Sequence, residues 1–309
     1  MRSLIRSVAA AATFGLVLTG CAVAPYAPAP GQPVAPGQPG APGQPSESGQ
    51  PTPSSSASTT PSTSASPGSS EPVQDAYVYF PRASSRGVRL GREVRPVEQD
   101  DPLVGALEAM IAGPLDPDYT TRWDADTTVN EVTTSGGVTT VDLSADARDG
   151  GGMSVQQAAA QADQLVWTVT EFVGAETKVM LTIDGTPAGR LWGAVTWDEP
   201  RARDIDPLGA RVLVSVDTPT EGARVSSPVV ITGDAAAHEA NVPWRVLDAA
   251  GAVVADGFTA TDAPIEFAPY RIEVTLPPGE YTIEVREDDI SDGEGFRPDI
   301  DTRRFVVEG

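Results

Sequence analysis

The part of the chain that follows residue 72 opens with two different spacings of apolar residues. A period of three to four residues predicts one helix that begins at Pro102, with Asp101 as its N-cap, and ends before a Gly-Pro pair. The same period predicts a longer helix after Ser154, where Gln157 completes a capping box. Shorter apolar or alternating runs predict strands near 77–80, 92–97, 128–134, 138–143 and 178–184, with Pro81 ending the first. This order indicates an α+β module over residues 73–197, in which both helices cover one face of a small mixed sheet.

From residue 211 to residue 309 the apolar positions follow only a period of two. Apolar and polar residues alternate near 212–216, 229–232, 242–246, 253–254, 270–276, 281–285 and 303–307. About seven short strands in roughly 100 residues, with one apolar face and one polar face, are typical of an all-β sandwich. A polar connector over residues 198–210 separates the two predicted modules.

The first 20 residues have the pattern of a bacterial lipoprotein signal peptide. Arg2 and Arg6 precede an apolar run that is too short to span a membrane, and Leu18–Gly20 then lead into Cys21. We predict cleavage before Cys21, the only cysteine, and attachment of acyl chains to it. An ordinary cleavage site at Ala22–Ala24 is the alternative. Lipidation would hold the protein on the outer face of the cell membrane, in an extracytoplasmic location, without crossing it.

Residues 22–72 consist almost entirely of Pro, Gly, Ser, Thr, Ala and Gln. A segment with so few apolar side chains cannot offset the entropy lost on ordering, so we predict a disordered tether behind the lipidated cysteine, over residues 21–72. Such a tether would reach about 150 Å as a polyproline II helix and about 40 Å as a flexible coil. Either length would lift the modules away from the membrane.

The charge and the cysteine content exclude several kinds of partner and site. The formal net charge of −22 repels phosphate backbones, so we exclude nucleic acid as a partner. A single cysteine allows no internal disulfide and no closed zinc or iron–sulfur site, and we expect no cofactor. The expected partners are the membrane, through the lipid anchor, and envelope proteins or peptidoglycan. Oligomerisation is left open.

Five short segments between residues 76 and 190 occur in the order and at the spacing of a known family. They are Val78–Phe80, Ala112–Pro114, Val141–Ser144, Leu165–Thr170 and Ile183–Gly185. In these segments the chain resembles the GerMN domain of sporulation and germination lipoproteins. The resemblance implies a non-catalytic envelope module whose fold is similar to that of ring-building domains in secretion-type assemblies.

A second set of segments, spread over residues 211–307, also occurs in the order and at the spacing of a known family. It comprises Pro219, Gly222, Val225–Pro228, Gly233 with Ala235, His238–Trp244, Asp248–Gly251 and Leu276–Tyr281. Here the chain resembles the immunoglobulin-like domain of bacterial spore germination, which usually follows a GerMN domain. The resemblance implies an immunoglobulin-like β-sandwich that is used for interaction.

Residues of the kinds that catalyse reactions are present but not in a catalytic pattern. His238 is the only histidine, and Val242 stands where a zinc protease of the H-E-x-x-H type needs a second one. No nucleophile elbow of the G-x-S-x-G type occurs. Asp142 and Ser144 follow a predicted strand, where such side chains usually form local hydrogen bonds. We therefore predict that the protein is not an enzyme.

An acidic segment near the C-terminus gives a weak calcium-loop pattern. Asp288, Asp292 and Asp299 fall on positions one, five and twelve of such a loop. Ile290, however, occupies a position that requires an oxygen donor, and the last ligand is normally Glu. The alternative is a solvated acidic loop without a metal.

Three tryptophans, Trp192, Trp197 and Trp244, are candidates for stacking on a glycan ring, and the alternative is burial in a core or between modules. The predicted function is that of a lipid-anchored scaffold or accessory interaction protein of the sporulation and germination type. Binding of peptidoglycan, another glycan or a small ligand is the alternative function. A cell-wall hydrolase is a third, which would need two carboxylates facing a cleft.

Overall fold

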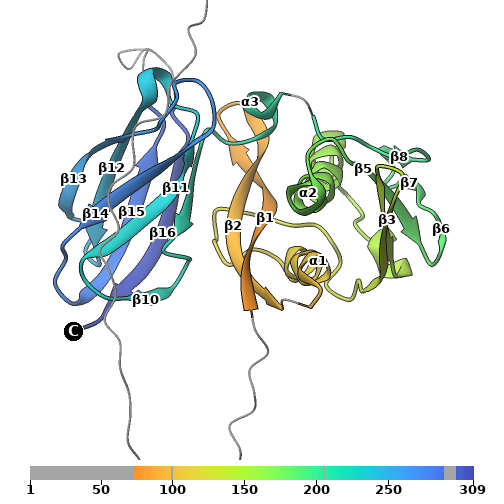
Figure 1. The fold of residues 1–309 in the computed structure, drawn as a ribbon, viewed down its shortest axis with the longest axis horizontal. Coiled ribbons are helices and arrows are strands. Elements are labelled where there is room, and N and C mark those ends of the chain that lie inside the picture. The colour runs from red at the N-terminus through yellow and green to blue at the C-terminus, as the bar shows by residue number, and fades with distance from the viewer. Residues whose placement is uncertain (1–72, 99, 205, 289–296) are drawn as a thin grey trace, which may run out of the picture. The chain divides into compact units, whose positions relative to one another are not determined.

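The computed structural model describes residues 73–98, 100–204, 206–288 and 297–309 (Figure 1). All of these residues belong to the same compact unit. In these ranges no helix has both the length and the apolar character needed to cross a membrane. The predicted signal peptide, Cys21 and the tether lie outside the described residues.

The first module contains two α-helices and eight strands among the described residues, besides a 3-10 turn at Ala145–Arg148. They are β1 (Val73–Ser84), β2 (Gly87–Glu98), α1 (Pro102–Ala112), β3 (Val129–Ser135), β4 (Val138–Leu143), α2 (Val155–Val173), β5 (Lys178–Ile183), β6 (Thr186–Pro187), β7 (Gly189–Leu191) and β8 (Val195–Trp197). β1 and β2 form an antiparallel ribbon, β7 and β8 form a small hairpin, and β3-β4-β5-β6 form a mixed sheet in that order. Within this sheet β4 and β5 are parallel, because α2 provides the crossover between them.

The predicted helix starts are confirmed by their caps. The Asp101 side chain accepts a hydrogen bond from the backbone N–H of Val104, and Pro102 opens α1. At the start of α2, Ser154 and Gln157 form both hydrogen bonds of the capping box. These signals are local in the sequence, which is why the helix positions could be predicted.

The helices form a middle layer, not a cover on one face of a single sheet. Both α1 and α2 contact the β1–β2 ribbon on one side, while α1 also contacts β3 and α2 also contacts β5 (Figure 1). The ribbon is a separate sheet, so the prediction of one small sheet is corrected in this respect, although the α+β class is confirmed. Val78 and Phe80 of β1 reach the same core as Leu107 of α1 and Leu165 of α2, and all four are fully buried.

Strand β1 is longer than the sequence pattern indicates. Pro81 was expected to end it, but the pairing with β2 continues through Pro81, opposite Leu90, to Ser84, opposite Gly87. A two-stranded ribbon consists only of edge strands, where a residue without an N–H is tolerated. The Pro81 carbonyl instead accepts hydrogen bonds from the backbone and the hydroxyl of Thr120.

The second module is a β-sandwich with eight strands in the described part of the chain. They are β9 (Val214–Thr218), β10 (Ala223–Val225), β11 (Val229–Ala235), β12 (Asn241–Asp248), β13 (Val253–Ala260), β14 (Ala268–Val274), β15 (Gly279–Arg286) and β16 (Ile300–Val307). One sheet has the order β10-β16-β15-β12-β13 and the other the order β14-β11-β9. The predicted all-β sandwich is therefore confirmed. The predicted connector contains a short helix, α3 (Pro207–Ala210), whose four residues are too few to show a helical period.

Candidate functional site

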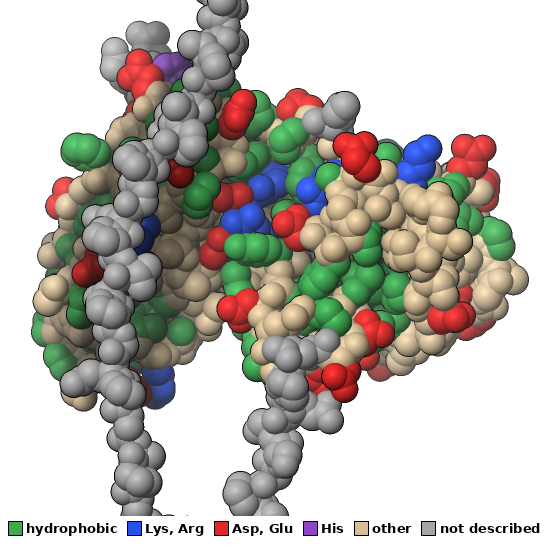
Figure 2. All heavy atoms as spheres, in the orientation of Figure 1, with side chains coloured by type: hydrophobic (Ala, Val, Ile, Leu, Met, Phe, Trp, Pro, Cys, Tyr) green, Lys and Arg blue, Asp and Glu red, His purple; other side chains and the backbone are tan. Residues whose placement is uncertain are grey.

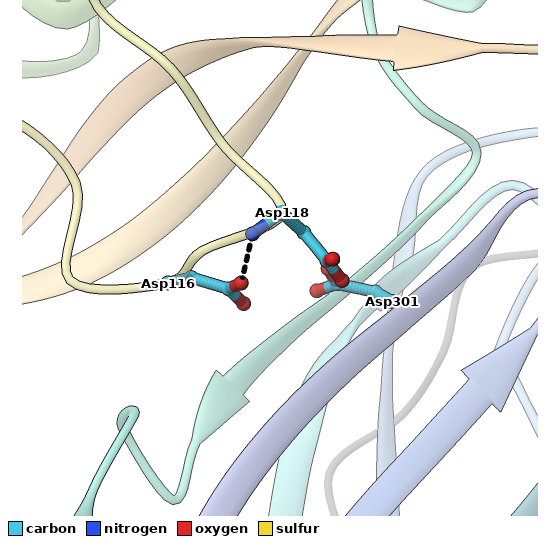
Figure 3. Close-up of side chains that lie close together, drawn as sticks. All are labelled: Asp116, Asp118 and Asp301. Carbon is cyan, nitrogen blue, oxygen red and sulfur yellow. Dashed lines mark hydrogen bonds between the residues drawn. The ribbon is translucent and has the colours of Figure 1, made fainter.

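Three carboxylates that are far apart in the sequence meet at one point (Figure 3). Asp116 and Asp118 lie in the loop after α1, and Asp301 lies on β16. One oxygen atom of each lies within 4.8 Å of the others. Asp116 and Asp301 are almost completely buried, with exposed fractions of 1% and 0%. Carboxylates at this spacing raise the question of a metal ion.

Arginine side chains already form ion pairs with all three carboxylates. Arg303, which is 1% exposed, forms ion pairs with Asp116 and, at 3.2 Å, with Asp301. Arg82 from the end of β1 lies 3.2 Å from Asp301 and 3.7 Å from Asp118. The positive charge that a metal ion would bring is therefore supplied by two guanidinium groups.

The remaining hydrogen bonds of Asp301 complete this arrangement. Tyr119 donates its hydroxyl hydrogen to Oδ1 over 2.8 Å, and the backbone N–H of Val216 donates to Oδ2 over 2.7 Å. Both carboxylate oxygens of Asp301 therefore have protein partners. A metal ion would have to displace at least one arginine, so these residues do not fit a metal centre.

A second group of buried ion pairs lies beside the first. Arg92 of β2 donates from Nε and Nη2 to Asp217 of β9 over 2.9 and 2.6 Å, and its Nη1 lies 2.9 Å from Asp234 of β11. Arg211, which follows α3, donates from both Nη atoms to Asp234 over 2.9 and 2.8 Å. Two arginines and two aspartates, all buried, thus balance each other.

A third group contains Arg86, which pairs with Glu287 and, at 3.2 Å, with Asp299. In every group an arginine of the β1–β2 ribbon pairs with acidic residues of the sandwich. We call the whole set the ionic joint. It consists of Arg82, Arg86, Arg92, Arg211 and Arg303 with Asp116, Asp118, Asp217, Asp234, Glu287, Asp299 and Asp301.

Burial determines how the joint titrates. Burial raises the pKa of Asp116 to about 7, although the neighbouring Arg303 guanidinium opposes this rise. Burial by itself would lower the pKa of Arg92, but Asp234 and Asp217 raise it above its ordinary value. Around Asp116 three carboxylates face two guanidinium groups. A proton held by Asp116 near neutral pH removes this excess of negative charge.

We expect the wild-type protein to lose stability relative to an Asp116→Asn variant as the pH rises from about 4 to about 7. The pKa of Asp116 is about 7 in the folded protein and about 3.9 in an unfolded chain, so the folded state binds the proton more tightly. The free energy of unfolding then falls as pH rises between these values, by at most about 1.4 kcal/mol per pH unit. Asparagine does not titrate and lacks this slope. Urea unfolding of both proteins across this range measures it, and parallel pH profiles would contradict it.

The three tryptophans that the sequence suggested for ligand stacking pack against the cores of the modules. Trp197 has no exposed surface, and its Nε1–H donates to the Val179 carbonyl over 3.1 Å. Trp192 packs edge-on against Trp123, with 5.2 Å between the ring centroids. Trp244 packs partly buried against the core of the sandwich. Each of the three thus contacts the interior of a module, as in the alternative interpretation.

The residues of the weak calcium-loop pattern are only partly described. Asp288 accepts a hydrogen bond from Asn241, and Asp299 is 5% exposed and belongs to the ionic joint. Asp292 lies outside the described residues, so the loop stays untested as a calcium site. His238 is exposed in a short 3-10 turn.

The ionic joint is the feature that the sequence analysis missed. One signal was present on β16, where residues 301, 303, 305 and 307 all face the interior. Phe305 and Val307 are apolar as expected, but the same alternation places Asp301 and Arg303 on the buried face. A charged pair in register with core residues is a sequence sign of a buried ion pair. No local sequence pattern indicates the residues of the first module that pair with Asp301 and Arg303.

Comparison with known proteins supports both resemblances found in the sequence. Residues 77–189 match the family described as sporulation and spore germination, and residues 213–294 match the immunoglobulin-like domain of bacterial spore germination. Neither description names an enzymatic activity. A search of curated proteins found no match.

Two solved structures similar to this chain come from the sporulation protein GerM of Bacillus subtilis. The tandem GerMN domains share 16% identity at a TM-score of 0.34, over 42% of this chain and 45% of that one, so the chain spans less than half of that structure. The first GerMN domain shares 21% identity at a TM-score of 0.34, over 42% of this chain and 99% of that one. By sequence, the first module is thus similar to the sporulation and spore germination family, and the second module is similar to the immunoglobulin-like domain of bacterial spore germination.

Proposed function

We propose that the protein is exported and held on the outer face of the cell membrane by acyl chains on Cys21. The lipobox pattern that ends at this cysteine supports the proposal, together with the polar composition of residues 22–72. Two or more acyl chains give stable attachment, and the tether lets the folded modules reach partners in the envelope.

In this location the protein acts as a scaffold or accessory interaction protein of the sporulation and germination type. The observation that supports this role is the ionic joint. Its buried acidic and basic side chains, which in an enzyme would be available for chemistry, pair with each other across the two modules. Buried ion pairs add little net stability compared with apolar packing, but they favour one particular arrangement. A partner therefore meets both modules as one composite surface.

The experiment compares the full-length protein with a Cys21→Ser variant, both produced in the native envelope. The wild type is expected in the membrane fraction and the variant in the soluble fraction, because only the wild type can be acylated. A carboxyl-reactive cross-linker suits a chain with 43 acidic and 21 basic residues. Cross-links from both modules to the same envelope protein, or to peptidoglycan, are the expected result.

Three outcomes would count against the proposed function. Retention of the Cys21→Ser variant in the membrane fraction would contradict attachment through acyl chains on Cys21. Cross-links from only one of the two modules would contradict the proposal that partners contact both modules as one surface. Turnover of purified cell wall by the wild-type protein would replace the contact function with the cell-wall hydrolase, the third function that the sequence suggests.

A further inference from the structure

A groove with a volume of about 770 Å³ lies against the end of α2. Three stretches line it together with Tyr79 and Arg92: residues between Trp167 and Lys178, connector residues 202–204 and 206–211, and the loop between β13 and β14 at Ile265–Phe267. The volume falls within the range of about 300–1,000 Å³ that is typical of sites for small organic ligands. Such sites also occur preferentially where two modules meet.

The floor of the groove is cationic and aromatic. Arg203 stacks on Trp167 at 4.1 Å, and its Nε and Nη2 donate to Thr170 and Glu171. Arg211 stacks on Phe267 at 4.0 Å. Its Nη atoms bind Asp234, but its Nε–H is buried and has no acceptor among the described residues. A buried donor without a partner, in the wall of a groove, indicates a place for an acceptor group.

The rim of the groove is mixed in charge. Lys178, the only lysine of the chain, is exposed there, and none of the ion pairs found among the described residues includes it. Four acidic residues share the rim: Glu176, Asp204, Asp206 and Glu266. Figure 2 shows Lys and Arg side chains gathered over the middle of the visible face, with Asp and Glu side chains around them. A ligand with only negative charge would be repelled by this rim, whereas a zwitterion matches it.

One rim residue is held in an unusual conformation. Ile265 has a φ of 61°, which is rare for a β-branched residue, and its side chain is 57% exposed. Its backbone N–H donates to the Ala237 carbonyl over 2.9 Å, which fixes the turn. Strained residues of this kind cluster at binding sites, and here the strain places an apolar side chain at the edge of the groove.

From these observations we propose that the groove binds a short peptide that has a free carboxylate and an apolar side chain. The carboxylate faces Lys178 and the Nε–H of Arg211, the ammonium group faces the acidic rim, and the apolar side chain packs on Ile265 and Phe267. The volume of the groove is more than a single small side chain needs, which favours a peptide over a free amino acid. This site is independent of the lipid anchor and of the contact function proposed above.

The single lysine makes a direct test possible. The full-length chain, purified in mild detergent, is reductively methylated with ¹³C-formaldehyde and a borohydride reductant, which keeps the charge of Lys178 and labels it for NMR. A Lys178→Arg variant identifies the signal by its absence. Trialanine is expected to shift this signal to saturation. Trialanine amide, which lacks the carboxylate, is expected to bind at least about tenfold more weakly, because a charge-assisted hydrogen bond is lost.

A pair of variants tests the apolar contact. Ile265→Gly removes the side chain and relieves the positive φ, so the fold is kept, and weaker binding of trialanine is expected. Phe258→Ser is the matched control, because Phe258 is 78% exposed and does not line the groove, and unchanged binding is expected. The proposal is overturned by the absence of a shift or by equal binding of the amide. It is likewise overturned if inorganic phosphate shifts the Lys178 signal as much as trialanine does, or if Ile265→Gly binds trialanine as tightly as the wild type.

Discussion

Replacing Arg303 with alanine is expected to lower the free energy of unfolding by about 3–5 kcal/mol, the cost of leaving a buried charge without its partner. Arg303 is 1% exposed, and both of its acidic partners, Asp116 and Asp301, are buried as well. It also donates to the backbone carbonyl of Arg92 over 3.2 Å, so the change removes a contact between β16 and the ribbon. Urea unfolding of the full-length protein, followed by tryptophan fluorescence, measures the loss.

The neighbouring residue provides a matched control. The Arg304 side chain is 67% exposed and pairs with Glu221 within the sandwich, so Arg304→Ala is expected to change stability little. Adding Asp116→Asn to Arg303→Ala is expected to recover part of the lost stability, because the orphaned carboxylate is then neutral. If Arg303→Ala and Arg304→Ala lost equal stability, charge pairing would not be the cause. The same conclusion would follow if adding Asp116→Asn to Arg303→Ala recovered no stability.

The elements that the sequence predicted correctly are those with local signals. Each helix has its capping residues within four positions of its start, and the Tyr281–Val285 strand alternates apolar and polar residues without interruption. The end of β1 was predicted wrongly, because the pairing of Pro81 depends on β2 and on Thr120. Whether a proline ends a strand is decided by its neighbours in space, and these are not visible locally.

The ionic joint was not predictable for a related reason. Its pairs connect residues such as Arg303 and Asp116, which are 187 positions apart. Charged residues are usually exposed, so composition alone favours a solvated surface for them. The tryptophans illustrate the opposite case, because large apolar side chains usually pack inside, and Trp197 does. Residue type alone therefore predicts the burial of Trp197 correctly, but it wrongly predicts that the arginines of the ionic joint are exposed.

Gly233→Ala is expected to be the most damaging small substitution in the sandwich, with a loss at the upper end of overpacking effects, about 3 kcal/mol. A Cβ at this position would lie 1.9 Å from the Ser215 carbonyl oxygen and 2.4 Å from the Tyr270 hydroxyl. The Tyr270 hydroxyl donates to that same carbonyl over 2.9 Å, so the ring lies across Gly233 and has no room to move. A shift of the backbone, and not of a flexible side chain, is needed to accept the methyl group.

The effect of this substitution should extend to the ionic joint. Val216, next to Ser215 on β9, donates its N–H to Asp301, and Asp234, next to Gly233 on β11, pairs with Arg92. Displacing either strand therefore moves a carboxylate of the joint. Gly151→Ala is the control, because no atom lies within 4 Å of its Cβ position, and a change within about 0.5 kcal/mol is expected. Equal midpoints of urea unfolding for the two variants would mean that β9 and β11 can shift to accept the methyl group at little cost. The ionic joint would then not depend on the exact pairing of these strands.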